Sequence, residues 1–167
     1  MAVFGQGSRD ATKLGKAVYR NFGKGEKGFN VSSCQFATHY FFENATTLHG
    51  FVRNLSENTA PGGYFVGTCY DGQTVFDLLR KYGEGAGFSL FVEGRKIFEV
   101  LKMYSQSGFT DDETSLGYPI NVFQETIGKH AVEYLVNFDY FARVMENYGF
   151  HVVVIIVTGK QIGRAHV

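Results

Sequence analysis

Hydrophobic and polar positions divide the first half of the chain into alternating strands and helices. Residues 29–34 and 64–69 read as short buried strands. Residues 44–57 and 73–81 repeat apolar positions every three or four residues, which predicts two helices. This strand, helix, strand, helix order makes a right-handed crossover in which the two strands lie parallel and adjacent. The sequence therefore predicts an α/β protein with a doubly wound sheet.

The N-terminal segment shows a weaker pattern. It is rich in glycine and lysine; apolar positions around Leu14 and Val18 predict one helix, and Val3 and Phe4 predict a strand stub. Residues 1–30 carry six Lys or Arg against two Asp or Glu, an excess of four positive charges (6 − 2). This segment could face phosphate, although a solvated surface is the simpler interpretation.

The hydrophobic period shortens toward two between residues 88 and 107, on both sides of the turn sequence Glu93-Gly94-Arg95. A β-hairpin fits this pattern, with a short helix near Phe98 as the alternative. Three further elements are predicted: a strand at 118–126, an amphipathic helix at 133–147 that ends at Gly149, and a strand at 152–157.

Composition favours one ordinary domain. The chain has 167 residues, of which 44% are hydrophobic and 16% aromatic, enough to bury a core. Sixteen basic residues balance sixteen acidic ones, so the total charge gives no broad electrostatic footprint for nucleic acid. No window reaches the apolar length of a membrane span, and the N-terminus lacks the pattern of a signal peptide. Cys34 and Cys69 each end an apolar run, which indicates free thiols in a reducing compartment.

A cluster of polar and aromatic side chains follows the first predicted strand, between Ser33 and Glu43. Gln35, His39 and Glu43 are spaced four apart and would share one face if the chain turns helical after Cys34. They would then stand at the carboxyl end of a strand, where open α/β sheets bind their ligands. Taken singly, His39 has the simpler interpretation of a buried histidine, and the four aromatics of the cluster that of core residues.

The run Gln35-Phe36-x-x-His39-Tyr40 and the run at 60–68 resemble the core of eukaryotic and viral mRNA cap guanine-N7 methyltransferases. The resemblance extends from Asp10 to Phe150, and several runs within it are similar to the versions in large double-stranded DNA viruses: 68–72, 115–118 and 133–138. It implies a Rossmann-like α/β methyltransferase that depends on S-adenosylmethionine and carries a β-rich cap-binding insertion. It also implies an N-terminal truncation, because the family's glycine-rich cofactor loop is expected before residue 1. A late aromatic of the cap pocket is expected after Phe150.

The resemblance assigns three residues to the cofactor, S-adenosylmethionine. Asp10 matches the acidic residue that receives the adenine amino group, a contact that suits a carboxylate acceptor. Gln35 and Tyr40 match contacts beside the methionine half. The resemblance implies no metal.

Three other residues are assigned to the cap. Phe36 and His39 match positions on the cap side, where a flat side chain under guanine contributes roughly 1–3 kcal/mol of stacking. Glu133 matches the carboxylate that accepts from the N1–H and N2 amine of guanine, a discrimination of roughly 1–3 kcal/mol. Taken singly, Glu133 would be a first-turn carboxylate at the start of its predicted helix.

The implied reaction is methyl transfer from S-adenosylmethionine to N7 of the cap guanine, which forms cap 0. N7 has its own lone pair and the sulfonium is a good leaving group, so we expect positioning to supply about 7–11 kcal/mol without an acid-base pair. Two alternatives remain open. One is a catalytically silent methyltransferase-like subunit of a capping complex, and the other is a small-molecule methyltransferase.

The implied partner is the 5′ end of capped mRNA. Triphosphatase and guanylyltransferase domains of the same polypeptide, or a stimulatory subunit, are further expected partners, and no membrane is expected. The implied location is the cytoplasm, in a viral factory or virion, or the host nucleus. Residues 1–157 are predicted to be a partial methyltransferase domain that is inactive in isolation. Residues 158–167 are predicted to be a non-native tail, because the final six residues back-translate to a sequence that resembles a sequencing adapter.

Overall fold

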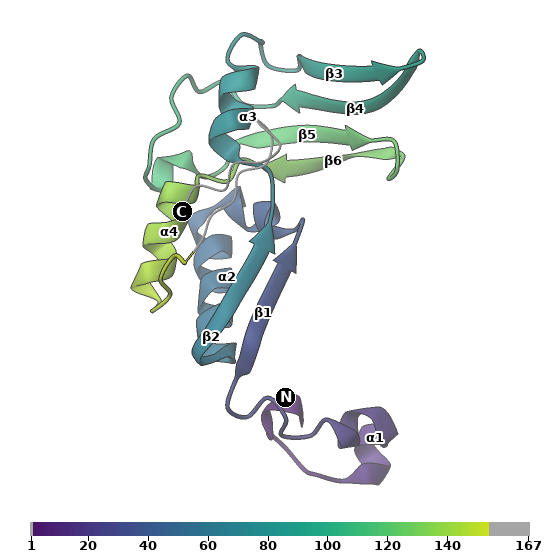
Figure 1. Cartoon of the computed structure of the whole chain (residues 1–167), viewed down its shortest axis with the longest axis vertical. Helices are drawn as coiled ribbons and strands as arrows, with labels where there is room; N and C mark the ends of the chain where they lie inside the picture. The colour runs from purple at the N-terminus through teal and green to yellow at the C-terminus, as the bar shows by residue number, and fades with distance from the viewer. Residues whose placement is uncertain (1, 154–167) are drawn as a thin grey trace.

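The computed structural model of the chain describes residues 2–153, which form two β-sheets and flanking helices (Figure 1). The smaller sheet is a parallel pair, β1 (Phe29–Gln35) and β2 (Thr59–Thr68). The larger sheet is antiparallel, with strands in the order β3 (Gly87–Val92), β4 (Arg95–Lys102), β5 (Pro119–Gln124) and β6 (Lys129–Tyr134). The α-helices of this range are α1 (Ala11–Arg20), α2 (Ala45–Asn58), α3 (Gly72–Leu79) and α4 (Phe138–Asn147). Its 3₁₀-helices are η1 (Ala2–Phe4), η2 (Thr38–Glu43) and η3 (Glu113–Ser115).

Helix α2 connects the two parallel strands, which confirms the predicted crossover. Asn44 caps this helix, and its side chain accepts a hydrogen bond from the backbone N–H of Thr47 at 3.0 Å. The apolar face of α2 is buried around Leu48. The strands pair in register up to Gln35 and Thr68, so their carboxyl ends finish side by side.

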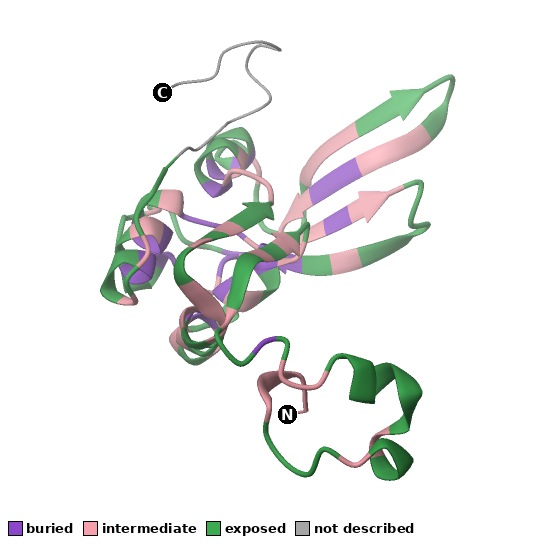
Figure 2. Cartoon of the chain, turned by 60° about the horizontal axis from the view of Figure 1, so that its bottom comes forward, coloured by how far each residue is buried: buried purple, intermediate pink, exposed green. Residues whose placement is uncertain are grey.

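The parallel strands are less buried than the sequence predicts. Val31 of β1 and Tyr64 and Val66 of β2 are exposed on the face that α2 does not cover, as Figure 2 shows for these strands. The prediction of two buried strands is therefore wrong, because no element among residues 2–153 covers one face of the pair. The second helical layer of a doubly wound sheet is not found between residues 2 and 153.

Two hydrophobic cores hold the rest of the described chain together. The first lies between α2 and α4 and contains Phe42, Val52 and Phe141. The second lies between α3 and the antiparallel sheet and contains Phe76 and Val122. The site described below lies where the elements of these two cores meet.

The antiparallel sheet begins with the predicted hairpin. Its turn lies at Glu93 and Gly94, whose φ angles of 50° and 79° fit a type I′ turn that matches the twist of paired strands. The alternative of a helix near Phe98 is wrong, since that residue lies in β4. β5 confirms the strand predicted at 118–126.

The fourth strand, β6, is not predicted by the sequence pattern. Glu133 lies in this strand, so its interpretation as a first-turn carboxylate of a helix is wrong. The apolar spacing does continue through Leu135, but α4 starts later, where the Asn137 side chain accepts from the backbone N–H of Tyr140 at 3.0 Å. Gly149, with a φ of 89°, ends α4 as predicted.

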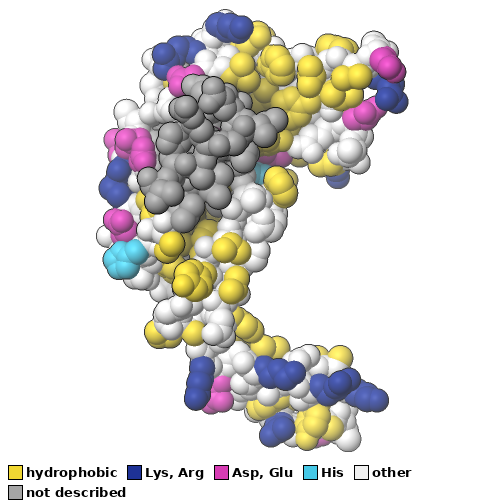
Figure 3. Space-filling model, in the orientation of Figure 1, with side chains coloured by type: hydrophobic (Ala, Val, Ile, Leu, Met, Phe, Trp, Pro, Cys, Tyr) yellow, Lys and Arg dark blue, Asp and Glu magenta, His cyan; other side chains and the backbone are white. Residues whose placement is uncertain are grey.

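Residues 2–28 form a unit that projects beyond the amino ends of the parallel strands (Figure 1). α1 confirms the predicted helix, whereas Val3 and Phe4 lie in η1, where a hydrogen bond from the Gly5 N–H to the Ala2 carbonyl closes the turn. Basic side chains are spread over this unit (Figure 3). At the other end, residues 152 and 153 lie in no strand. The rest of the strand predicted at 152–157, and the tail predicted at 158–167, fall outside the described residues.

Candidate active site

The carboxyl ends of β1 and β2 meet the antiparallel sheet at η2, which packs against β6 (Figure 1). This packing brings His39 of η2 to Glu133 of β6. The prediction that Gln35, His39 and Glu43 share one helical face is wrong. Gln35 still belongs to β1, and a 3₁₀-helix has three residues per turn, so His39 is buried while Glu43 is exposed.

His39 and Glu133 form the buried polar centre of the site. Nε2 of His39 lies 3.6 Å from Oε2 of Glu133, and the two residues are only 5% and 7% exposed. Neither ring nitrogen of His39 nor Oε2 of Glu133 has a hydrogen-bond partner among residues 2–153. A buried polar group without a partner costs about 1–3 kcal/mol. This centre is therefore suited to a ligand that brings its own hydrogen-bonding groups.

Burial shifts the pKa values of both groups toward the uncharged forms. It raises the pKa of Glu133 to about 7 and lowers the pKa of His39. The contact between them is therefore not a strong ion pair at neutral pH, because the lowered pKa of His39 favours its neutral imidazole. A carboxyl group that titrates near pH 7 in a buried position is typical of functional sites.

The loop after β2 forms a wall beside Glu133. Burial raises the pKa of the Cys69 thiol to about 12, and the nearby Glu133 charge contributes to the rise. The Tyr70 hydroxyl accepts a hydrogen bond from Nε2 of Gln124 at 2.6 Å, and its ring meets Phe98 edge-on at 6.2 Å. Burial, and then Glu133, raise the pKa of Tyr70. The site thus includes Tyr70 of this loop and Gln124 of β5, which the sequence motifs did not single out as ligand contacts.

Gly72, at the end of the loop after β2, packs closely against the segment that connects β6 to α4. The Gly72 N–H donates to the Val136 carbonyl at 3.0 Å, and a Cβ on Gly72 would clash with the same oxygen. A larger residue would force the two segments apart. The close approach explains why glycine is needed where α3 begins.

The aromatics of the Ser33–Glu43 cluster divide into two groups. Phe42 is fully buried and Phe41 is half-buried, so they are core residues. Phe36 is 74% exposed and Tyr40 is 47% exposed, which the core interpretation does not explain. The Tyr40 ring also meets the His39 ring at a centroid distance of 4.3 Å. Two aromatic side chains of this cluster are therefore exposed, and that of Tyr40 contacts the buried polar centre.

The structure brings five of the six predicted site residues to this end of the parallel strands and leaves Asp10 apart. Asp10 is the N-cap of α1, in the projecting unit at the other end (Figure 1). Its Oδ1 accepts from the backbone N–H of Thr12 at 2.9 Å and from the Thr12 hydroxyl at 2.7 Å. These hydrogen bonds, the hydroxyl one first, lower the pKa of Asp10.

Residues 2–153 contain no group of three or more His, Cys, Asp or Glu side chains that could hold a metal ion. No helix in this range is long and apolar enough to cross a membrane. Cys34 and Cys69 are free thiols, as predicted.

Residues 8–161 match the family described as mRNA (guanine-N(7))-methyltransferase domain. The chain belongs to this family. The match confirms both the resemblance carried by the Gln-Phe-x-x-His-Tyr run and the α/β methyltransferase fold class. A methyltransferase of this kind implies S-adenosylmethionine as the methyl donor.

Curated relatives are similar to this chain over part of their length. The "Probable mRNA-capping enzyme" of Acanthamoeba polyphaga mimivirus is 27% identical over 128 residues, which cover 72% of this chain and 10% of that protein. The mRNA cap guanine-N(7) methyltransferase 1 of Arabidopsis thaliana is 29% identical over 128 residues, which cover 75% of this chain and 32% of that protein. The mRNA cap guanine-N(7) methyltransferase of Drosophila melanogaster is 40% identical over 57 residues, 34% of this chain and 13% of that protein. The chain thus spans between a tenth and a third of the length of these relatives.

Proposed function

We propose that this chain is part of an enzyme that transfers a methyl group from S-adenosylmethionine to N7 of the guanine cap of mRNA. The observation that carries the proposal is the buried Glu133 carboxyl group, whose Oε2 has no partner among the described residues and lies beside His39. Family membership and the names of the relatives support the same activity.

Guanine offers hydrogen-bond donors, which Oε2 of Glu133 lacks among the described residues. The N1–H and N2 amine can donate to the two oxygens of an ionised carboxylate, a pairing that adenine cannot make and that is worth roughly 1–3 kcal/mol. Since burial makes the free carboxylate costly, these two hydrogen bonds would offset the cost only when guanine is bound. We propose Glu133 as the residue that selects guanine.

The exposed aromatic side chain of Phe36 suits the flat face of the base. Stacking of a base on an aromatic ring contributes roughly 1–3 kcal/mol. Methylation at N7 makes guanine cationic, and a cation over an aromatic face is further stabilised. We propose that Phe36 and His39 hold the cap guanine, the first by stacking and the second through its unpartnered ring nitrogens.

The methyl donor is assigned to the same end of the strands. S-adenosylmethionine supplies an activated methyl group on its sulfonium. Gln35 and Tyr40 fit its methionine half, because both side chains are exposed where β1 ends. Asp10 does not lie with them in this structure, so its proposed contact with the adenine amino group rests on the resemblance alone. Positioning of donor and acceptor would supply most of the rate.

We extend the proposal to partners and location. The capped 5′ end of mRNA would be the substrate. The mimivirus relative, which is much longer than this chain and is named a capping enzyme, supports triphosphatase and guanylyltransferase activities in the same polypeptide or complex. A cytoplasmic viral factory or virion would fit such an enzyme.

The test is methyl transfer from labelled S-adenosylmethionine to guanosine-capped RNA by the full-length gene product. We expect His39→Ala to lower kcat/KM about tenfold or more, because it removes hydrogen-bonding groups from a buried ligand site. His49→Ala is the matched control, since His49 of α2 pairs with the Tyr148 hydroxyl and with no predicted site residue, so its loss should leave transfer unchanged.

Each outcome of this assay separates the proposal from its alternatives. Equal rates for wild type and His39→Ala, with both proteins folded, would contradict the site. Binding of a cap analogue without binding of S-adenosylmethionine would indicate a silent subunit. Methyl transfer to a small molecule that cap analogues do not inhibit would indicate a small-molecule methyltransferase.

A further inference from the structure

Phe36 has an unusual backbone for an exposed aromatic residue. Its φ angle is +52°, in the left-handed region that side chains with a Cβ rarely adopt. Among residues 2–153, Glu93 is the other non-glycine residue with a positive φ, and the type I′ turn of the hairpin explains it. No hairpin turn requires the conformation of Phe36. Strain of this kind persists only where the surrounding structure holds it, and it gathers at functional sites.

The contacts that hold Phe36 come from one residue, Thr68, at the end of the neighbouring strand. The Phe36 N–H donates to the Thr68 carbonyl at 2.8 Å and to the Thr68 hydroxyl oxygen at 3.1 Å. The same hydroxyl donates to Oε1 of Gln35 at 2.9 Å. Nε2 of Gln35 in turn donates to the Ser33 hydroxyl at 3.0 Å. The Thr68 hydroxyl therefore joins two consecutive residues of the Gln-Phe-x-x-His-Tyr run.

Packing does not set the direction of the Phe36 ring. The residue is 74% exposed, and its ring pairs with no other aromatic ring within residues 2–153. Its orientation therefore depends on its backbone, which the Thr68 contacts hold. The Gln35 amide is fixed in the same way, because its oxygen accepts from Thr68 and its nitrogen donates to Ser33.

We propose that Thr68 is a positioning residue of the site, and that its hydroxyl fixes the Phe36 ring and the Gln35 amide together. This inference rests on the proposed function, in which Phe36 faces the cap guanine and Gln35 faces the methyl donor. One hydroxyl group then sets the relative placement of the two substrates. A small misplacement of reacting groups can cost about 100-fold in rate, so this link is worth more than its hydrogen bonds alone.

The test compares Thr68→Val with Thr68→Ser in the full-length gene product. Valine keeps the branched shape but removes the hydroxyl, and serine keeps the hydroxyl. We expect Thr68→Val to lower kcat/KM for capped RNA about tenfold or more and to raise the KM for both substrates. We expect Thr68→Ser to stay within about threefold of wild type, because its hydroxyl can make the same two hydrogen bonds. Thr68→Ala replaces the valine variant if that protein does not fold.

A double-mutant cycle shows whether Thr68 acts through Phe36. Phe36→Ala removes the ring that Thr68 positions, so adding Thr68→Val to it should lower capped-RNA binding little further. Additive losses would overturn the inference, as would a Thr68→Val enzyme within threefold of wild type. A wild-type protein that does not methylate capped RNA would instead overturn the proposed function. The two failures are therefore distinguishable.

Discussion

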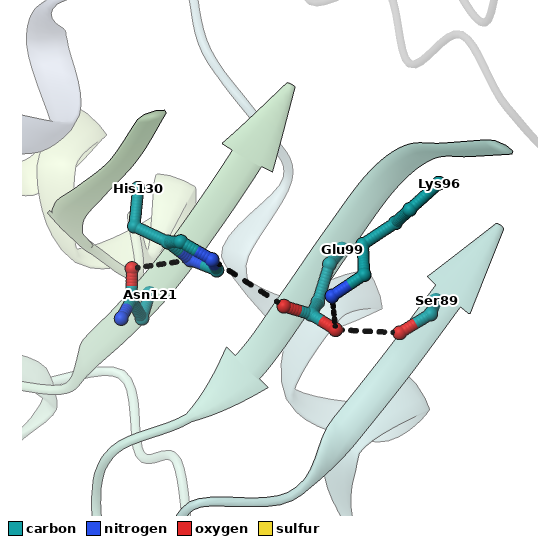
Figure 4. A network of polar contacts seen from close by, with 5 residues as sticks. All are labelled: Ser89, Lys96, Glu99, Asn121 and His130. Atoms are coloured by element: carbon teal, nitrogen blue, oxygen red, sulfur yellow. Dashed lines mark hydrogen bonds and ion pairs between the residues drawn. The ribbon is translucent and has the colours of Figure 1, made fainter. Parts of the chain in front are cut away.

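The two faces of the antiparallel sheet each carry one buried glutamate, and the surroundings of the two differ sharply. Glu99 of β4 accepts from the Ser89 hydroxyl at 2.8 Å and from the Lys96 ammonium at 2.7 Å, and its other oxygen lies 3.6 Å from His130 (Figure 4). Glu133 of β6 lies on the opposite face. Side chains alternate between the two faces along a strand, and Glu133 is an odd number of residues from His130, which lies on the face of Glu99. Its Oε2 has no hydrogen-bond partner among residues 2–153.

We infer that the difference separates a structural carboxylate from a functional one. The Lys96 hydrogen bond, followed by that of Ser89, holds the pKa of Glu99 below its ordinary value. Burial without partners raises the pKa of Glu133 to about 7. A buried polar group without a partner destabilises the fold, so we infer that Glu133 is kept for a ligand that completes it. Glu99 needs no ligand, because its own sheet supplies the donors.

The largest effect expected from this comparison is on methyl transfer. Glu133→Gln should lower kcat/KM for guanosine-capped RNA about 5- to 150-fold, because an amide can accept only one of the two guanine hydrogen bonds. Glu99→Gln should leave kcat/KM within about twofold, since Glu99 lies on the other face of the sheet. Steady-state kinetics with the full-length gene product measures both values. Equal losses in the two variants would show that the assay reports damage to the sheet.

A smaller effect is expected from pH. In the proposed pairing guanine needs the ionised form of Glu133, and with a pKa of about 7 only about a tenth of this group is ionised at pH 6. We therefore expect binding of a guanosine-cap analogue to strengthen about tenfold between pH 6 and pH 8 and to level off above. The raised pKa values of Cys69 and Tyr70, which face Glu133, keep those groups uncharged over this range, and the lowered pKa of His39 favours its neutral form.

Isothermal titration with the Glu133→Gln variant provides the control for the pH effect. This variant has no carboxyl group at the site, so its weaker binding should not change between pH 6 and pH 8. If it shows the same pH dependence as wild type, the titrating group is not Glu133.

The sequence predicted most of the fold where local signals were strong. Asn44 marked the start of α2, Gly149 marked the end of α4, and Glu93-Gly94 marked the hairpin turn. The errors lie where tertiary contacts decide. The apolar spacing around Leu135 suggested a helix, but this segment crosses the core in extended form and continues β6. Burial of the parallel strands was also wrong, because the pattern shows which residues can be buried and not what covers them.

The candidate site was predicted only in part, again because tertiary contacts decide which side chains are exposed. The family motif named five residues that the structure brings to one end of the strands, but it did not show which of its aromatics stand free. Phe36 and Phe42 are the same residue type in the same cluster, yet Phe36 is exposed and Phe42 is fully buried. Thr68 could not be found from the pattern, because its role depends on the register that sets it beside Gln35. Only the pairing of two distant strands reveals it.

The smallest expected effect is on the free energy of unfolding, which the Glu99→Gln and Glu133→Gln substitutions should change in different directions. Glu99→Gln should lower the free energy of unfolding at pH 8 by about 1–2 kcal/mol, because the amide loses the charge-assisted hydrogen bond to Lys96. Glu133→Gln should leave it unchanged or raise it by about 1 kcal/mol, because no buried charge then needs solvation. Urea denaturation at several pH values measures both.

The pH dependence of these two changes follows from the direction of each pKa shift. The lowered pKa of Glu99 means that its contribution is present above its ordinary value of 4.5 and is lost as the pH falls through the folded-state value. The raised pKa of Glu133 means that its folded form keeps a proton that the unfolded chain releases, so stability falls as the pH rises from 4.5 to about 7. The stabilities of the two variants should therefore differ most above pH 7 and converge toward pH 4. If the Glu133→Gln protein is instead less stable than wild type at pH 8, then Glu133 has a structural partner and the contrast with Glu99 does not hold.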